Sequence, residues 1–233
     1  MAQNNNKQEK TSHMGTRRQL LNKNSNFAVR EAYKTLRTNI RFLLRDHKCK
    51  RISITSGLSG EGKSITLTNL AISLAEDGQR VLLIDADMRR PALSRLLMES
   101  ATPGLSDILS GQASAQEAVR EELYPNLDVI FSGDVPPNPS ELLGSNAMRE
   151  LIDTMSERYD YILVDTPPVG MVSDACIVTN LLDGVLMLVR QDWAKKETVR
   201  RAVANMEMTG IKPLGYVLNG VDINEGKYGH YYE

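Results

Sequence analysis

Eight consecutive residues decide how this chain folds, and they read Gly57-Leu58-Ser59-Gly60-Glu61-Gly62-Lys63-Ser64. The pattern G-x-x-x-x-G-K-S is typical of a loop that binds the phosphates of a nucleoside triphosphate. Glycines let the backbone curl so that several N–H groups face the same phosphates, and a helix beginning at the loop adds its positive dipole end. Lys63 is expected to reach the β- and γ-phosphates, and the Ser64 hydroxyl is expected to bind Mg²⁺. The predicted nucleotide-binding residues here are Gly60, Glu61, Gly62, Lys63, Ser64 and Ile65.

The segments on either side of this loop have the pattern that a nucleotide site requires. Residues 52–55 alternate as a short strand does, and residues 65–77 have helical apolar spacing that ends at Gly78. A bare match to the motif can arise by chance. Its position between a strand and a helix predicts a true nucleotide site.

The composition is that of an ordinary globular protein, with 41% hydrophobic and 24% charged residues in a chain of 233. This length is sufficient for one well-buried α/β domain. No apolar run approaches the ~20 residues of a membrane-spanning helix, and the polar, Asn-rich start is not a signal peptide. Cys49 and Cys176 lack metal-ligand spacing, so we expect a reduced cytoplasmic chain without disulfide or zinc. We expect no nucleic-acid partner.

Positive charge is concentrated at the N-terminus. Residues 1–51 contain 13 Lys and Arg against 3 Asp and Glu, whereas the rest of the chain is acidic. Such an arm is expected to meet a membrane surface, an acidic partner or the acidic body of a second copy, or it is only a solvated basic end. Residues 1–26 are polar and are predicted to be a disordered arm.

The segment from Ala28 to Arg45 is predicted to form an amphipathic helix, with Ser25 or Asn26 as its cap. A seam of apolar residues and a stripe of cations share nearly the same spacing. The seam is Val29, Tyr33, Leu36, Ile40 and Leu43, and the cations are Arg30, Lys34, Arg37, Arg41 and Arg45. Five cations on one face repel one another, and docking against carboxylates or phosphates would relieve that repulsion.

Strands and helices alternate from Arg51 onward, which predicts an α/β fold with a mostly parallel central sheet and helices on both faces. Further strands are expected at 81–87, 127–131, 161–165, 184–189 and 214–218. Helices are expected at 91–99, 105–109 and 115–122, in a segment ending near 158, and at 174–181 and 197–209. This domain spans 27–222, and residues 223–233 are expected to be a flexible tail.

Three aspartates lie where two of these strands end, and ligands bind at that edge of open α/β sheets. Asp165 is expected to hold Mg²⁺ beside the phosphate loop. Asp85 and Asp87 share a strand face, so one of them is expected near Mg²⁺ and the other is free to orient or deprotonate an attacking hydroxyl. The alternative is that these side chains cap a following helix or pair with Arg89 and Arg90.

Three stretches together resemble the nucleotide motifs of the bacterial tyrosine kinases, and more narrowly the cytoplasmic autokinase of capsule and exopolysaccharide synthesis in Gram-positive bacteria. They are residues 60–64, 82–91 and 162–168, and 136–143, 31–33 and 36–40 match further family segments. The resemblance implies the fold of P-loop nucleoside triphosphatases and an ATP- and Mg²⁺-dependent kinase. Lys63 would hold the phosphates, Ser64, Asp85 and Asp165 would arrange Mg²⁺, Asp87 would be the base, and Asn219 would contact adenine.

The resemblance also implies acceptors and partners. Tail tyrosines Tyr228, Tyr231 and Tyr232 would be phosphorylated by a neighbouring subunit. A ring of subunits would use the N-terminal helix, through Glu31, Lys34 and Arg37. A membrane-embedded adaptor would activate the kinase through its cytoplasmic tail and recruit it to the inner face of the membrane, and a tyrosine phosphatase would reverse the modification.

Some residues depart from the family pattern. Ser59 replaces a proline, Ile65 replaces a threonine, and Lys34 replaces an arginine, so it lacks the bidentate fork of a guanidinium. None of these changes removes a phosphate ligand. The tyrosine tail is also short.

Three other functions compete with this interpretation. An ATP-driven switch of the division-site or partition type shares the sheet, but carries a second lysine where this chain has Leu58. An iron–sulfur carrier ATPase needs paired cysteines that this chain lacks. A degenerate nucleotide-binding adaptor is disfavoured because every phosphate and Mg²⁺ ligand is present.

Overall fold

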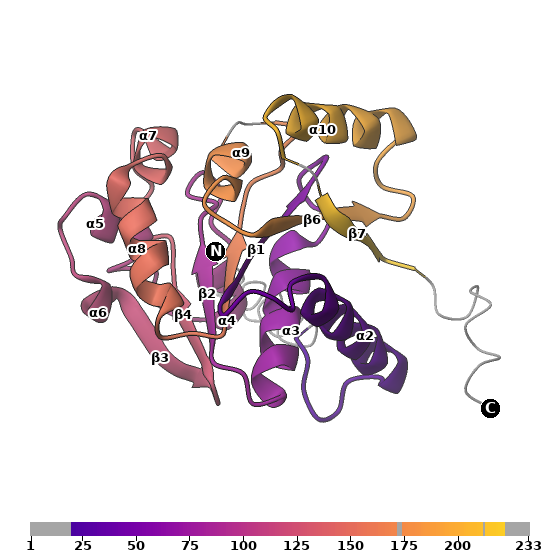
Figure 1. The fold of residues 1–233 in the computed structure, drawn as a ribbon, viewed down its shortest axis with the longest axis horizontal. Coiled ribbons are helices and arrows are strands. Elements are labelled where there is room, and N and C mark those ends of the chain that lie inside the picture. The colour runs from indigo at the N-terminus through magenta and orange to yellow at the C-terminus, as the bar shows by residue number, and fades with distance from the viewer. Residues whose placement is uncertain (1–19, 172–173, 212, 222–233) are drawn as a thin grey trace, which may run out of the picture.

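The computed structural model describes residues 20–171, 174–211 and 213–221, and within them a seven-stranded sheet lies between two layers of helices (Figure 1). The order of strands across the sheet is β3-β4-β2-β5-β1-β6-β7. All neighbouring strands are parallel except the pair of β3 and β4 at one edge. The strands are β1 Lys50–Ser56, β2 Val81–Asp85, β3 Val119–Tyr124, β4 Leu127–Ile130, β5 Tyr161–Asp165, β6 Gly184–Arg190 and β7 Pro213–Asn219.

Helices cover both faces of the sheet, as the alternation predicts (Figure 1). They are α2 Phe27–Leu43, α3 Lys63–Glu76, α4 Leu93–Leu97, α5 Leu105–Leu109, α6 Ala115–Ala118, α7 Pro139–Leu143, α8 Asn146–Ser156, α9 Asp174–Thr179 and α10 Lys196–Met208. Within these elements, α2, α3 and α4 pack on one face, while α5, α7, α8, α9 and α10 pack on the other. None of these helices is long and apolar enough to cross a bilayer, over the ranges that the structure describes.

The central strands carry apolar residues on both of their faces. All five residues of β2 are buried. Leu83 faces the cluster under α3, and Leu82 and Ile84 face the cluster under α8. Parallel sheets are covered on both sides and therefore read as continuous apolar runs. The two central strands that carry the acids are held this way, so their carboxyl ends are fixed in position.

The predicted helix over 115–122 is wrong in its second half. Ser114 and Glu117 form a capping box that starts α6, but the helix lasts four residues. From Val119 the chain becomes β3, which pairs antiparallel with β4 and has a bulge between Arg120 and Tyr124. Pairing with an open sheet edge and burial of apolar side chains outweigh the helical spacing here.

Residues 20–26 differ from the disordered arm predicted for 1–26. Leu20 and Leu21 are buried in the main core. The backbone N–H of Leu21 donates to the side-chain oxygen of Asn69 on α3, at 2.8 Å. The Asn26 side chain caps α2 by accepting from the N–H of Ala28, as expected for one of the two predicted caps. Two leucines among polar residues are a weak local signal, and only their contact with α3 shows their role.

Helix α2 packs directly on α3, and two of its cations bind the end of that helix. Arg37 donates to the carbonyl oxygen of Ser73 at 2.6 Å and lies 3.1 Å from the carboxylate of Asp77. Arg41 also pairs with Asp77. Cations stabilise the negative C-terminal end of a helix dipole. Part of the repulsion predicted for the cationic stripe is therefore relieved inside the chain.

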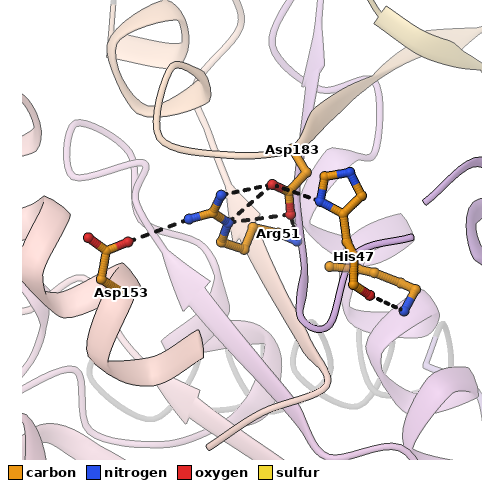
Figure 2. A network of polar contacts seen from close by, with 5 residues as sticks. His47, Arg51, Asp153 and Asp183 are labelled. Atoms are coloured by element: carbon orange, nitrogen blue, oxygen red, sulfur yellow. Dashed lines mark hydrogen bonds and ion pairs between the residues drawn. The ribbon is translucent and has the colours of Figure 1, made fainter. Parts of the chain in front are cut away.

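A polar network stabilises the edge of the sheet at which β1 and β6 begin (Figure 2). Asp183, just before β6, accepts from Arg51 at 2.8 Å, and Nδ1 of His47 lies 3.3 Å from the same carboxylate. Asp153 of α8 lies 3.5 Å from the Arg51 guanidinium. Burial favours a higher pKa for Asp183, but hydrogen bonds from Arg51 outweigh it and lower the pKa. The start of β1, which leads to the phosphate loop, is thereby fixed to β6 and α8.

Candidate active site

The predicted phosphate loop connects the end of β1 to the beginning of α3, as its flanking patterns predict. Gly60 and Gly62 have φ angles of 82° and 101°, which strongly favour glycine. A Cβ on Gly62 would lie 2.4 Å from Nδ2 of Asn219, so a side chain there would also collide with β7. Lys63 opens α3 and is buried. The loop thus places backbone N–H groups and one lysine at the N-terminus of a 14-residue helix.

The Glu61 side chain holds the loop from inside. It is fully buried, and its carboxylate accepts from the N–H of Leu58 at 2.7 Å and from the N–H of Arg190 at 3.0 Å. Glu61 was predicted as a nucleotide-binding residue. Its carboxylate is used within the protein, so its backbone N–H is the part left to face a phosphate.

Asp85 and Asp165 lie side by side at the carboxyl ends of β2 and β5, where they are register partners. Both carboxylates are buried. Burial, followed by repulsion from Asp165, raises the pKa of Asp85 to about 8. Burial also raises the pKa of Asp165 to about 6, against the attraction of Lys63. Two buried carboxylates on neighbouring strands repel each other when both are ionised, and a proton or a bound cation relieves that repulsion.

The surroundings of Asp165 fit a magnesium ion. Neither of its buried oxygens accepts a hydrogen bond from the described residues. The Ser64 hydroxyl lies near Asp165 and opposes the rise in its pKa. The two side chains do not form a hydrogen bond with each other. Mg²⁺ prefers carboxylate, hydroxyl and phosphate oxygens. The orphaned carboxylate and the hydroxyl therefore have the chemistry of a magnesium site.

Asp85 and Asp87 also stabilise the turn that follows β2, in part as the capping alternative predicts. One Asp85 oxygen accepts from the N–H groups of Ala92 and Leu93, at 3.2 and 3.1 Å. One Asp87 oxygen accepts from the N–H of Arg90, at 3.1 Å. These bonds hold both carboxylates in place. Burial raises the pKa of Asp87, which makes it a better proton acceptor than an exposed aspartate.

Arg89 does not pair with the strand-end aspartates, although that was one alternative. It forms a bidentate pair with Asp174 at the start of α9, at 2.6 and 3.2 Å, and donates to the Ser140 hydroxyl at 3.1 Å. Ser140 in turn donates to Asp174, which is buried. Asp174 could not be identified as a site residue from the sequence, because no local pattern singles it out. The network ties the turn that bears Asp87 to α7 and α9.

Asn219 lies beside the loop, and its amide is engaged there. Its Nδ2 donates to the carbonyl oxygen of Glu61 at 2.8 Å, and its Oδ1 accepts from the N–H of Gly220. The adenine contact predicted for Asn219 stays a prediction. Two further residues near the loop, Arg190 and Trp193, were missed by the sequence analysis because they lie more than a hundred residues from it.

The remaining predicted residues lie away from the loop or outside the described ranges. Glu31 and Lys34 form an ion pair of 2.6 Å on α2, and Arg37 is bound to the end of α3. The predicted acceptors Tyr228, Tyr231 and Tyr232 fall in residues 222–233, outside the part of the chain that the structure describes.

Comparison with known proteins gives close relatives. The family model described as "AAA domain" matches residues 49–197. The chain is 40% identical over 202 residues to the tyrosine-protein kinase YwqD of Bacillus subtilis (strain 168), covering 86% of this chain and 85% of that protein. Its fold matches the kinase domain of the Escherichia coli tyrosine kinase ETK with a TM-score of 0.79 and 35% identity, over 82% of this chain and 75% of that one.

The division-site alternative is the more distant one. The MinD cell division protein of Aquifex aeolicus matches with a TM-score of 0.61 and 27% identity, over 78% of this chain and 73% of that one. Both the sequence and the structure are thus nearer to the kinases than to the switch ATPases. The chain belongs to the bacterial tyrosine kinase family and is a tyrosine-protein kinase with the P-loop nucleoside triphosphatase fold.

Proposed function

We propose that this kinase transfers the γ-phosphoryl group of ATP to Tyr228, Tyr231 and Tyr232 of a neighbouring copy. The observation that carries the proposal is the arrangement at the sheet edge: Lys63, the orphaned carboxylate of Asp165 and the half-buried carboxylate of Asp87 all meet at the loop. Burial raises the pKa of both aspartates, and the nearby positive charge of Lys63 opposes that rise at each of them.

The residues have distinct parts in the transfer. The loop N–H groups and Lys63 bind the β- and γ-phosphates. Ser64, Asp85 and Asp165 would hold Mg²⁺, which would neutralise charge on those phosphates. Asp87 accepts the proton of the tyrosine hydroxyl as the phenol oxygen bonds to the γ-phosphorus. The bond from that phosphorus to the bridging oxygen breaks, and ADP leaves with the electron pair. The raised pKa of Asp87 favours this proton transfer.

We further propose that the phosphorylation regulates the synthesis and export of capsular or exopolysaccharide. A membrane-embedded adaptor would activate the kinase at the inner face of the membrane, and a tyrosine phosphatase would remove the phosphates. The support is the motif resemblance together with the 40% identity to a tyrosine-protein kinase over most of the chain.

Mass spectrometry of the chain isolated from its own cells tests the acceptors. We expect phosphotyrosine at Tyr228, Tyr231 or Tyr232 in the wild type and none in Lys63→Met, because the lysine no longer neutralises the phosphates. For transfer between copies, Lys63→Met is co-expressed with an active chain whose three tail tyrosines are phenylalanine. Phosphate on the tail of the Lys63→Met chain is expected. An unmodified tail there, beside a modified wild type, would contradict transfer between copies.

We also propose that α2 contributes to a ring of subunits through Glu31, Lys34 and Arg37. Lys34→Glu is expected to lower the mass measured by light scattering, because it places a negative charge in the proposed contact. Lys48→Glu is the control, since Lys48 is also an exposed lysine in an ion pair, here with Glu157, but lies outside α2. An equal mass for the two variants would remove Lys34 from the interface. Arg37→Ala is less informative, because it also breaks contacts with α3.

A further inference from the structure

Three successive carbonyl groups of the phosphate loop are each held by a side chain from the region of β6 and β7. The indole Nε1 of Trp193 donates to the carbonyl oxygen of Ser59 at 3.2 Å. The Arg190 guanidinium donates to the carbonyl oxygen of Gly60 at 3.1 Å. The amide of Asn219 donates to the carbonyl oxygen of Glu61 at 2.8 Å. These side chains lie more than 120 residues beyond the loop in sequence.

The direction of these carbonyls fixes the direction of the next N–H groups. A trans peptide unit is planar, so its C=O and the following N–H point in opposite directions. When the oxygens of Ser59, Gly60 and Glu61 are drawn toward β6 and β7, the N–H groups of Gly60, Glu61 and Gly62 point the other way. In the described part of the chain none of these three N–H groups donates a hydrogen bond. Successive N–H groups on one side of a loop form an anion-binding nest.

The three side chains are themselves held in place. The Arg190 guanidinium lies 4.6 Å from the centre of the Trp193 ring, in a cation–π contact. The backbone N–H of Arg190 donates to the buried Glu61 carboxylate, and that of Gln191 donates to the Asn219 carbonyl at 2.9 Å. The ring packs so closely that a Cβ on Gly60 would lie 3.0 Å from it. Contacts within the protein therefore fix the positions of the three donors.

We propose that Arg190, Trp193 and Asn219 are positioning residues that preorganise the phosphate nest by binding its carbonyl groups. The inference rests on the proposed binding of phosphates by this loop and deepens it. The ligand of the nest is a diphosphate or triphosphate group, and the three residues act on it through the loop backbone. A preorganised nest binds phosphate more tightly because the loop loses less conformational freedom on binding.

Calorimetric titration of the full chain with ADP and with pyrophosphate, each with Mg²⁺, tests the proposal. Trp193→Phe keeps an aromatic ring at this position but removes the N–H donor. We expect its Kd to rise about fivefold for both ligands, the effect of one ordinary hydrogen bond. Arg190→Met keeps the stem over the ring and is expected to behave in the same way. Tyr216→Phe is the control, because it changes an exposed aromatic side chain on β7 and is expected to leave both Kd values unchanged.

Each outcome decides the proposal. If the Kd rises for ADP but not for pyrophosphate, these side chains contact the base, and the proposal is overturned. Unchanged Kd values for both ligands would also overturn it. In kinetics the two variants are expected to raise KM for ATP with little change in kcat, because the nest binds ground state and transition state alike. If the wild-type chain binds neither ligand, the proposed phosphate loop itself fails, which is a separate result.

Discussion

Replacing Asp87 by asparagine is expected to lower the rate of tyrosine phosphorylation by about a thousandfold, since positioned general bases contribute roughly 10²–10⁴-fold. Asparagine has the same size and its side-chain oxygen can still accept from the N–H of Arg90, so the turn after β2 should keep its shape. What the variant loses is the carboxylate that is proposed to accept the phenol proton. Its affinity for ADP should remain close to that of the wild type, because the proposed phosphate ligands are in the loop.

The measurement is the initial rate of phosphotyrosine formation, with ADP affinity measured on the same samples. Asp134→Asn serves as the control, because Asp134 is an exposed carboxylate outside the loop, β2 and β5. A rate within tenfold of the wild type would show that Asp87 only caps its turn. A large loss of ADP affinity would instead assign Asp87 to nucleotide binding.

Asp165→Asn is expected to stabilise the protein in the absence of Mg²⁺ at pH 7 and above. The folded pKa of Asp165 is about 6, well above the ordinary 3.8, mainly because the group is buried. An acid whose pKa is raised by folding stabilises the fold when it is protonated, and this contribution is lost as pH rises through the folded pKa. Asparagine carries no charge at any pH, so the variant would recover the stability that the wild type loses when Asp165 ionises.

Thermal unfolding between pH 4.5 and 8 (about the range in which Asp165 loses its proton in the folded state) checks this prediction. The difference between Asp165→Asn and the wild type should grow from pH 4.5 to pH 7. Adding Mg²⁺ with ADP should stabilise the wild type more than the variant, because the variant has lost a charged ligand. A variant that is less stable than the wild type at pH 8 without Mg²⁺ would show that Asp165 is already paired within the fold.

Much of the site could be predicted from sequence because its signals are local. The glycine spacing around Lys63 and the apolar runs ending in Asp85 and Asp165 each lie within a single strand–loop segment. Parallel pairing then brings the two acids together, since the carboxyl ends of neighbouring parallel strands share one edge.

The rest depends on contacts between distant segments, which no local pattern reveals. In the sequence, Glu61 is an ordinary loop glutamate. Only the fold shows that its carboxylate faces inward and binds the end of β6. In the sequence, Asp174 is an ordinary first residue of a helix. Only the fold shows that it pairs with Arg89 from the turn after β2. The edge strand β3 directly follows the short helix α6. Its residues form a strand because they pair with the neighbouring strand β4.

The long helix α3 runs from the phosphate loop to the cations of α2 without a break. Its 14 residues span about 20 Å at 1.5 Å each. Lys63 is its first residue, and Ser73 and Asp77, which Arg37 holds, lie at its other end. Because α3 is one continuous helix, a movement of one of its ends also moves the other end. If α2 contacts other subunits as proposed, a displacement of α2 would therefore be transmitted along α3 to Lys63, the residue proposed to bind the triphosphate.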